Sequence, residues 1–336
     1  MNSARSSLPR RRRRSSRAPL GALLATALVA TAALTACSPP DDDRTGEMIQ
    51  VNTAQGSVQV TGIPKRIVTL GSQWIDTALA FGVTPVGYLD QSEVVSGTTA
   101  PWVGDRLADS KKIDPENIVA EIAALDPDLI LAEKFMAAAQ PDNFAKVKDI
   151  APTIPGITGK QIDPWQDQVT LFGTLTRETD KAEKITAGVD GRIEKVKSDL
   201  PGLRGKTYSL AFMFSSEEIQ VMADPTDGAG VLFASLGLEV APKLAAEFAE
   251  NKQPRFPIST ENVPMLDADM LAVTASNQAL KRQLVRLPGY SSLRAVRSHA
   301  VAELSLAEIT GLNQPTALSI PHMLDVLRPV LTKVAQ

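Results

Sequence analysis

The sequence predicts an α/β protein with two lobes and one long connecting helix, and three observations lead to this fold class. Short apolar runs alternate with longer amphipathic segments, which is typical of α/β folds. This order of strands and helices occurs once in each half of the chain. Between the halves lies an amphipathic segment without a flexible Gly/Ser linker, so we expect the lobes to be held at a fairly fixed angle.

The first half contains four predicted strands and two clear helices. The strand RIVTL is rich in β-branched residues and lies between Pro64 and Gly71, and the helix that follows it ends at Gly82. The helix in PENIVAEIAALDP is expected to have Asp114 as its N-cap and Pro115 in its first position. The four strands are predicted at 66–70, 84–88, 128–132 and, more weakly, 153–157.

The second half repeats the architecture without repeating the sequence. GAGVLFASLG is predicted to form a helix that starts at Thr226 or Asp227. TALSIPHMLDVLRPVL is predicted to close the chain as a helical segment kinked by Pro321 and Pro329. The strands of this half are predicted at 206–214, 219–222, 269–274 and 299–304.

The connecting helix is predicted over 163–201. Its apolar residues recur at steps of three and four, with one interruption, which indicates an amphipathic helix. Asp163-Pro164 caps its start and Pro201 ends it, so about 36 residues form a rod of roughly 54 Å. The lobes on either side are expected at 49–162 and 202–336.

The N-terminus reads as an export signal. Residues 1–20 carry seven arginines and no acid, and an apolar run reaches Ala36. This run is short for a membrane-spanning helix, which needs about 20 apolar residues. Cys37, the only cysteine, follows small residues and precedes a proline-acid run, so 1–36 is interpreted as the signal and 37–48 as a flexible tether.

Charge and motif content exclude several classes of protein. The chain has 35 basic and 38 acidic residues; without the seven arginines of the signal the balance is 28 against 38, near −10, which argues against nucleic acid as a partner. Two histidines and one cysteine argue against a zinc or copper site built from side chains. The sequence has no G-x-S-x-G elbow, P-loop or H-E-x-x-H motif, so we expect no enzyme.

Several segments together resemble a known family. PKRIVTLGSQWIDTALAFGVTPVGYLD, IAALDPDLILA, the long helix, ISTENVPMLDADMLAV and the proline-broken C-terminal helix resemble substrate-binding lipoproteins of ferric-siderophore ABC importers, a group that includes cobalamin- and haem-binding proteins. The resemblance implies two Rossmann-like three-layer α/β lobes, one rigid inter-lobe helix and a ligand cleft between the lobes. Leu34-Thr35-Ala36-Cys37 resembles a lipobox, which implies that Cys37 is acylated and anchors the protein to the outer face of the cytoplasmic membrane.

This resemblance implies a monomeric receptor that captures a ferric siderophore and delivers it to an ABC permease. Iron would be bound only through the siderophore, without a cofactor of the protein. Ferric catecholates are strongly anionic and are usually met by several cations. Here the positions after the strands offer only Lys134 and Arg255, which favours a hydroxamate or mixed-ligand siderophore. A haem- or cobalamin-binding protein, or an envelope adaptor that binds another protein, remain the alternatives.

Candidate ligand-binding residues follow the predicted strands, because ligands of open α/β sheets lie beyond the carboxyl ends of the strands. Trp74, Phe135 and Met136 could instead belong to the core, and alternation along 206–214 could bury Phe214. The resemblance adds Phe256 as a stacking residue and Arg255 as a partner for an acidic group. The candidates are Gln73, Trp74, Trp102, Lys134, Phe135, Met136, Phe214, Arg255, Phe256, Ser276, Asn277, Glu308, Asn313 and Gln314.

Docking to the permease in this family uses one exposed glutamate on each lobe. Glu261 of ISTENV matches the position on the C-terminal lobe. On the N-terminal lobe the matching residue is Ala120, so either Glu116 or Glu121 is the candidate substitute.

Overall fold

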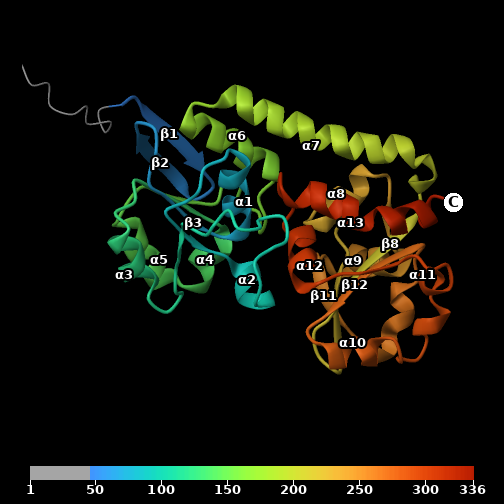
Figure 1. The fold of residues 1–336 in the computed structure, drawn as a ribbon. Coiled ribbons are helices and arrows are strands. Elements are labelled where there is room, and N and C mark those ends of the chain that lie inside the picture. Colours follow the sequence, from blue (N-terminus) through green and yellow to red (C-terminus); the bar gives the residue numbers. More distant parts are fainter. Residues whose placement is uncertain (1–45) are drawn as a thin grey trace, which may run out of the picture. The chain divides into compact units, whose positions relative to one another are not determined.

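The computed structural model describes residues 46–336, and its N-terminal lobe is built on a five-stranded parallel sheet in the order β5-β4-β3-β6-β7 (Figure 1). The strands are β3 (Ile67–Leu70), β4 (Gly87–Leu89), β5 (Lys111–Lys112), β6 (Leu129–Ala132) and β7 (Thr153–Pro155). The helices are α1 (Ser72–Ala80), α2 (Gln91–Ser96), α3 (Ile118–Ala124), α4 (Lys134–Ala139) and α5 (Pro141–Lys148).

Both faces of this sheet are covered. Along β6, Leu129 and Leu131 belong to one apolar core, whereas Ile130 and Ala132 belong to a second. Successive side chains of a strand point to opposite faces, so the continuous apolar run LILA supplies both cores. The predicted three-layer arrangement is therefore confirmed for this lobe.

The C-terminal lobe has a mixed six-stranded sheet. β8 pairs in parallel with β10 and β12, whereas β9 is antiparallel to both β8 and β11. The strands are β8 (Thr207–Met213), β9 (Glu218–Met222), β10 (Glu239–Val240), β11 (Arg255–Ser259), β12 (Met270–Ala275) and β13 (Val301–Glu303). The helices are η2 (Pro201–Leu203), α8 (Ala229–Ser235), α9 (Pro242–Asn251), η3 (Thr260–Leu266), α10 (Gln278–Leu284), η4 (Tyr290–Ser292), α11 (Arg294–Arg297), α12 (Leu306–Asn313) and α13 (Ser319–Val334).

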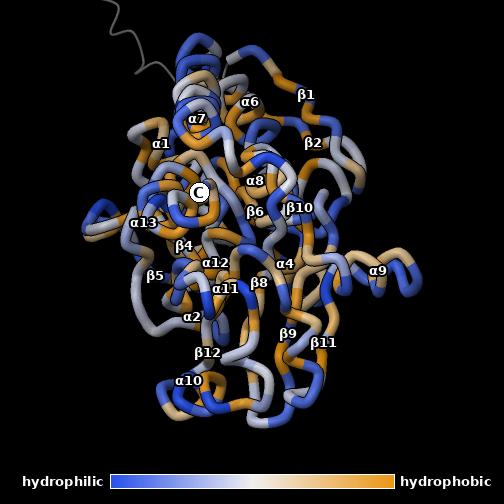
Figure 2. The backbone as a smooth tube through the Cα atoms, turned by 90° about the vertical axis from the view of Figure 1, so that its right-hand side faces the viewer, coloured by the Kyte–Doolittle hydropathy of each residue, from blue (hydrophilic) through white to orange (hydrophobic). Residues whose placement is uncertain are grey.

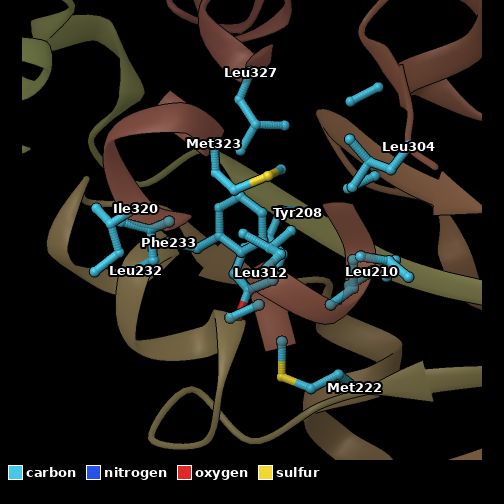
Figure 3. Packing of buried hydrophobic residues seen from close by; sticks show 14 of the residues in the cluster. Tyr208, Leu210, Met222, Leu232, Phe233, Leu304, Leu312, Ile320, Met323 and Leu327 are labelled. Carbon is cyan, nitrogen blue, oxygen red and sulfur yellow. The ribbon is translucent and has the colours of Figure 1, made fainter. Parts of the chain in front are cut away.

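The core of this lobe is formed by α8, α12 and α13 against the sheet. The rings of Tyr208 and Phe233 lie 4.2 Å apart between centroids, tilted by 37°. Figure 3 shows Met323 and Leu327 of α13 and Leu312 of α12 packed around this pair. The C-terminal helix is thus part of the core, and its last residues complete the lobe.

The predicted rod over 163–201 is two helices. α6 (Trp165–Thr176) ends where Arg177 takes a left-handed conformation with φ 58°, and α7 (Thr179–Asp199) starts two residues later. Gly173 lets the two helices pack closely, because a Cβ on it would lie 2.7 Å from that of Ala182. α7 alone spans about 31 Å between the lobes (Figure 1), and most of its residues are hydrophilic (Figure 2).

Several elements were not predicted from the sequence. The hairpin of β1 (Met48–Thr53) and β2 (Gly56–Thr61) forms a separate two-stranded sheet. The strands β5, β10 and β11 and the helix α9 were also not predicted. The start of α3 was placed too early, since Asn117 occupies the N-cap and Asp114 instead accepts a hydrogen bond from the Glu116 backbone N–H at 3.0 Å.

Candidate functional site

Three carboxylates lie buried at the carboxyl edge of the N-terminal sheet, and the sequence analysis did not identify them. Asp90 directly follows β4, Glu133 directly follows β6, and Asp76 lies on α1. We call these residues the carboxylate cluster. Polar residues after strands are an available signal, but their burial depends on contacts that are distant in the sequence.

Glu133 is held beneath the start of α1. Its Oε1 accepts the Gln73 backbone N–H at 2.8 Å, and a side chain at Gly71 would overlap this carboxylate. Gly71 has φ 132°, so both the backbone conformation and the close approach require glycine. Burial raises the pKa of Glu133 to about 8, and the nearby charges of Asp90, Asp163 and Asp76 act in the same direction.

Asp76 receives hydrogen bonds from two distant parts of the chain. Its Oδ2 accepts the indole N–H of Trp102 at 2.7 Å and the hydroxyl of Thr316 at 2.6 Å. Burial raises the pKa of Asp76 to about 7, although these two hydrogen bonds oppose the shift. Asp90, whose pKa is also raised by burial, accepts the Ser72 hydroxyl at 2.7 Å.

Gln73 joins the two halves of the chain and is buried rather than available to a ligand. Its side-chain N–H₂ donates to the backbone carbonyls of Asp163 and Pro315, each at 3.2 Å. Both donors already have protein acceptors, so a ligand would have to replace them, and the ligand contact of Gln73 stays a prediction.

The junction of the lobes encloses a small polar cavity of about 10 Å³. This space holds no molecule larger than water, so a bulky ligand must bind outside it. The N-terminal lobe and α12 of the C-terminal lobe both contribute to its walls. The lining residues are Ser72, Asp76, Asp90, Ser92, Ala100, Trp102, Thr310, Gly311 and Gln314.

Three of the predicted apolar contacts lie in the cores. Trp74 is 0 % exposed and its indole donates to the Ala132 carbonyl at 3.2 Å. Met136 and Phe256 are also buried, in the cores of the N-terminal and C-terminal lobes respectively. None of these three side chains has appreciable surface in this structure, and their ligand contacts stay predictions. Phe135 is half-buried against the same core as Met136.

Phe214 is the large aromatic candidate that remains on the surface. It is 58 % exposed at the end of β8, and its ring meets that of Phe212 edge-on at 5.8 Å. We call Phe212 and Phe214 the aromatic pair. Phe212 was missed, although alternation along the strand places both residues on one face.

The two predicted cationic contacts already have protein partners. The Lys134 ammonium donates to the Gly159 carbonyl, and Arg255 pairs with Asp227 at 3.0 Å. Both side chains are thus held by the fold in this structure. An acidic ligand group would have to compete with these partners.

A larger cavity, about 400 Å³, lies at the carboxyl ends of β12 and β13. The predicted residues Ser276 and Asn277 line it, and the Asn277 side chain caps α10 by accepting the Leu280 N–H at 3.0 Å. The cavity rim carries a 2.6 Å ion pair between Lys281 and Glu303. Ser276 anchors this edge to the aromatic pair, since its hydroxyl donates to the Phe214 carbonyl at 3.0 Å.

The remaining candidates lie on α12 or directly after it. Glu308 forms a capping box with Ser305 at the start of the helix, so it serves the helix itself. Asn313 and Gln314 each have a buried side-chain oxygen without a hydrogen-bond partner among residues 46–336. Gln314 lines the small cavity, and Asn313 approaches Gly228 through its backbone carbonyl.

The candidate docking glutamates differ in their surroundings. Glu261 is exposed at the start of η3, and Glu116 is exposed in the turn before α3. Glu121 is half-buried, accepts the Asp114 N–H at 2.8 Å and pairs with Lys111 at 3.2 Å. Of the two candidates on the N-terminal lobe, Glu116 therefore has the more accessible carboxylate.

Cys37 and the export signal lie outside the described residues. Within 46–336, no helix is both long and apolar enough to cross a bilayer. The same part of the chain contains no group of three or more His, Cys, Asp or Glu side chains placed to hold a metal ion.

Comparisons with known proteins identify the family. The family model described as "Periplasmic binding protein" matches residues 89–306. The "Probable siderophore-binding lipoprotein YfiY" of Bacillus subtilis is 30% identical over 73% of this chain and 75% of its own length. The "Iron(3+)-hydroxamate-binding protein FhuD" of the same organism is 26% identical over 73% and 77%.

Solved structures share the two-lobe fold. A periplasmic solute binding protein from Mycobacterium smegmatis superimposes with a TM-score of 0.70 at 27% identity, covering 86% of this chain and 99% of that one. Staphylococcus aureus SirA, complexed with staphyloferrin B, gives 0.68 at 22% identity over 86% and 100%, which supports the fold alone. With the family match spanning well over half of its length, this chain belongs to the periplasmic binding protein family.

Proposed function

We infer that the protein is an extracytoplasmic binding protein that captures a ferric siderophore and delivers it to an ABC permease for iron uptake. The observation that carries this conclusion is the 30% identity to a probable siderophore-binding lipoprotein over 73% of the chain. The protein acts as a non-enzymatic receptor and binds iron through the siderophore. The reported relatives favour this function over the haem, cobalamin and adaptor alternatives.

We place the ligand at the carboxyl edge of the C-terminal sheet, facing the N-terminal lobe. The aromatic pair offers an exposed apolar surface there, and Asn277 lines the adjacent cavity of about 400 Å³. An aromatic surface with a few neutral polar groups suits a bulky ligand held by one face. Phe214 is the residue that we expect to contribute most to affinity.

The charges near the lobe junction favour a ligand of low net charge. Lys134 and Arg255 already have protein partners, and the Arg106 guanidinium donates to the Trp102 and Val103 carbonyls. The carboxylate cluster beneath the junction adds negative potential to the extent that it is ionised. A ferric hydroxamate or mixed-ligand siderophore therefore suits the site better than a ferric catecholate.

Delivery would use Glu261 on the C-terminal lobe and Glu116 on the N-terminal lobe as docking residues, because both carboxylates are exposed. We further propose that Cys37 carries the lipid anchor on the outer face of the cytoplasmic membrane. In this scheme residues 49–162 and 202–336 form the lobes of a monomer.

The test is a tryptophan-fluorescence titration of residues 38–336 against ferric hydroxamate, ferric catecholate, ferric citrate, haem and cobalamin. Saturable quenching by the hydroxamate at sub-micromolar concentration is the expected result. Saturation by the catecholate alone would overturn the charge argument. If the fluorescence of demonstrably folded protein does not change with any of these ligands, the proposed siderophore binding is wrong.

A further inference from the structure

The two lobes meet at the Asp76 carboxylate. Asp76 and its partner Trp102 belong to the N-terminal lobe, whereas Thr316 lies between α12 and α13 of the C-terminal lobe. Asp76 is only 3 % exposed, so its hydrogen bonds are shielded from water. This oxygen can accept both hydrogen bonds whether Asp76 is ionised or protonated, and burial makes them electrostatically stronger than they would be in water.

The Trp102 ring adds a steric contact to this junction. It packs so tightly on Gly311 of α12 that a methyl group there would overlap the indole. The His322 ring also lies close to it, 5.3 Å away between centroids. The adjacent cavity of about 10 Å³ does not have room for the indole ring. Separating the lobes at this point must therefore move Trp102 away from Gly311 and break the Asp76–Thr316 bond.

We propose that Asp76, Trp102 and Thr316 form a latch between the lobes, and that protonation of Asp76 keeps this latch closed. Ligand release requires the cleft to widen, so the latch would set how readily bound ligand leaves. The latch itself is a property of the protein without ligand. Only its effect on release rests on the proposed function.

The charged surroundings of Asp76 give the direction of the pH dependence. On the N-terminal lobe, Asp90 raises its pKa and Arg106 lowers it, and Glu133 lies in the same cluster. On the C-terminal lobe, the nearest titratable groups around the Trp102 ring are His322 and its neighbour Glu308, 3.7 Å apart. Desolvation is the largest influence and favours the protonated acid.

Opening the latch would admit water to this carboxylate and return its pKa from about 7 towards 3.8. The open form then binds the proton less tightly than the closed form. Raising the pH through this window therefore favours opening, and the effect levels off above about pH 7. The latch is expected to be stronger on the acidic side.

The first experiment measures the latch in ligand-free protein. NMR hydrogen exchange of the indole N–H groups gives a protection factor for each tryptophan after correction for intrinsic exchange. We expect the protection of Trp102 to fall at least about tenfold between about pH 5 and pH 8. The Trp74 indole, bonded to Ala132 within one lobe, is the internal reference and should stay protected.

Asp76→Asn keeps the shape and the acceptor oxygen but removes the titration. In this variant the protection of Trp102 should change less than about twofold over the same pH range. An unchanged, wild-type pH profile in the variant would overturn the role of Asp76. Thr316→Val removes the hydrogen bond from the other lobe at similar volume, together with the bonds that the hydroxyl accepts from the Leu318 and Ser319 backbone N–H groups, and should lower the protection of Trp102 at every pH.

Gly311→Ala tests the steric part without altering any polar group. The residue lies inside α12, where alanine is a better helix former than glycine, so the variant should fold. The added methyl should push the indole outward and lower the protection of Trp102 at least about tenfold at acidic pH. Gly188→Ala on the exposed side of α7, with no atom within 4 Å of the new methyl, is the matched control. Equal protection in the two variants would contradict the latch.

The dissociation rate of a ferric hydroxamate chelate then connects the latch to release. Gly311→Ala should increase this rate. Wild type should release the chelate faster at about pH 8 than at about pH 5, and this difference should be smaller in Asp76→Asn. If indole protection behaves as expected but no chelate binds, the latch stands and the proposed function fails. If the chelate binds but release is equal in all variants, the role of the latch in release fails.

Discussion

The Thr316 hydroxyl donates a 2.6 Å hydrogen bond to the Asp76 carboxylate, across a separation of 240 residues. This bond connects the first helix of the N-terminal lobe to the segment before the last helix of the chain. The Asp76 carboxylate is buried at the lobe junction, and among the described residues no cationic side chain lies at hydrogen-bond distance from it. Stability, lobe geometry and pH response are therefore linked at this position.

Stability should decrease as the pH rises from about 5 to about 8. Asp76 and Glu133 have folded-state pKa values of about 7 and about 8, raised above their ordinary values, so the native state binds more protons than the unfolded state in this range. Urea unfolding midpoints at a series of pH values measure the slope. The double variant Asp76→Asn/Glu133→Gln should flatten it; a slope as steep as that of wild type would show that other groups control it.

Trp74→Phe should destabilise the protein without selectively weakening ligand binding. The substitution leaves a cavity in the core and an unpaired Ala132 carbonyl, which together cost about 2–3 kcal/mol. Urea denaturation and chelate titration under native conditions are the two measurements. An unchanged stability together with a large loss of affinity would instead support Trp74 as a ligand contact.

Phe214→Ala should weaken chelate binding and leave stability nearly unchanged. An exposed ring contributes little to the fold, so the free energy of unfolding should change by less than about 0.5 kcal/mol. Loss of one aromatic contact worth about 1.5 kcal/mol would lower affinity about tenfold. Met48→Ala, which truncates another exposed apolar residue on the β1–β2 hairpin, serves as control and should retain full affinity.

Gly173→Ala should destabilise the α6–α7 hairpin although alanine favours helix. The new methyl would lie 2.7 Å from the Ala182 Cβ and 3.2 Å from the Glu178 carbonyl, and such overpacking costs roughly 1–3 kcal/mol. Gly191→Ala on α7, with no atom within 4 Å, should instead stabilise by up to about 1 kcal/mol. Thermal unfolding of the pair checks the opposite signs, and a stabilised Gly173→Ala would mean that the two helices can move apart at little cost.

Glu261→Ala should reduce siderophore-dependent iron uptake by cells while the isolated protein keeps its affinity for the chelate. The exposed carboxylate contributes to docking in the proposed scheme but lies outside the aromatic pair and the cavity. Uptake assays of the variant and of Glu250→Ala, an exposed glutamate on α9, provide the comparison. Normal iron uptake with the Glu261 variant would show that this residue is not needed for docking.

Local sequence determined the eight predicted strands and the helices α1, α3, α6, α7, α8 and α13, but not the other strands and helices. IVTL and LILA are buried at successive positions because both faces of a parallel sheet are covered, and β3 and β6 form there. The apolar period of the connecting segment indicated helix correctly. The interruption in that period, between Leu175 and Ala182, coincides with the turn at Arg177. Without a glycine or proline there, the interruption alone did not indicate that the chain folds back.

The candidate site was predicted less well, because exposure depends on which distant segments pack together. Polar and aromatic residues after strands were the candidates, but the side chain of Gln73 is held by Pro315 and Trp74 points into the core. The edge strand β11 was missed since its pairing with β9 is not encoded in its own short, proline-containing sequence.

The sequence by itself therefore determined the fold class, the two-lobe organisation and the family resemblance, since these depend on local periodicity and on the order of motifs. The tertiary structure alone decided which side chains are buried, where the connecting helices turn, and that Asp76 lies at the lobe junction. The physical reason is that burial and pKa are set by neighbours in space. For Asp76 the decisive neighbour, Thr316, comes 240 residues later in the chain.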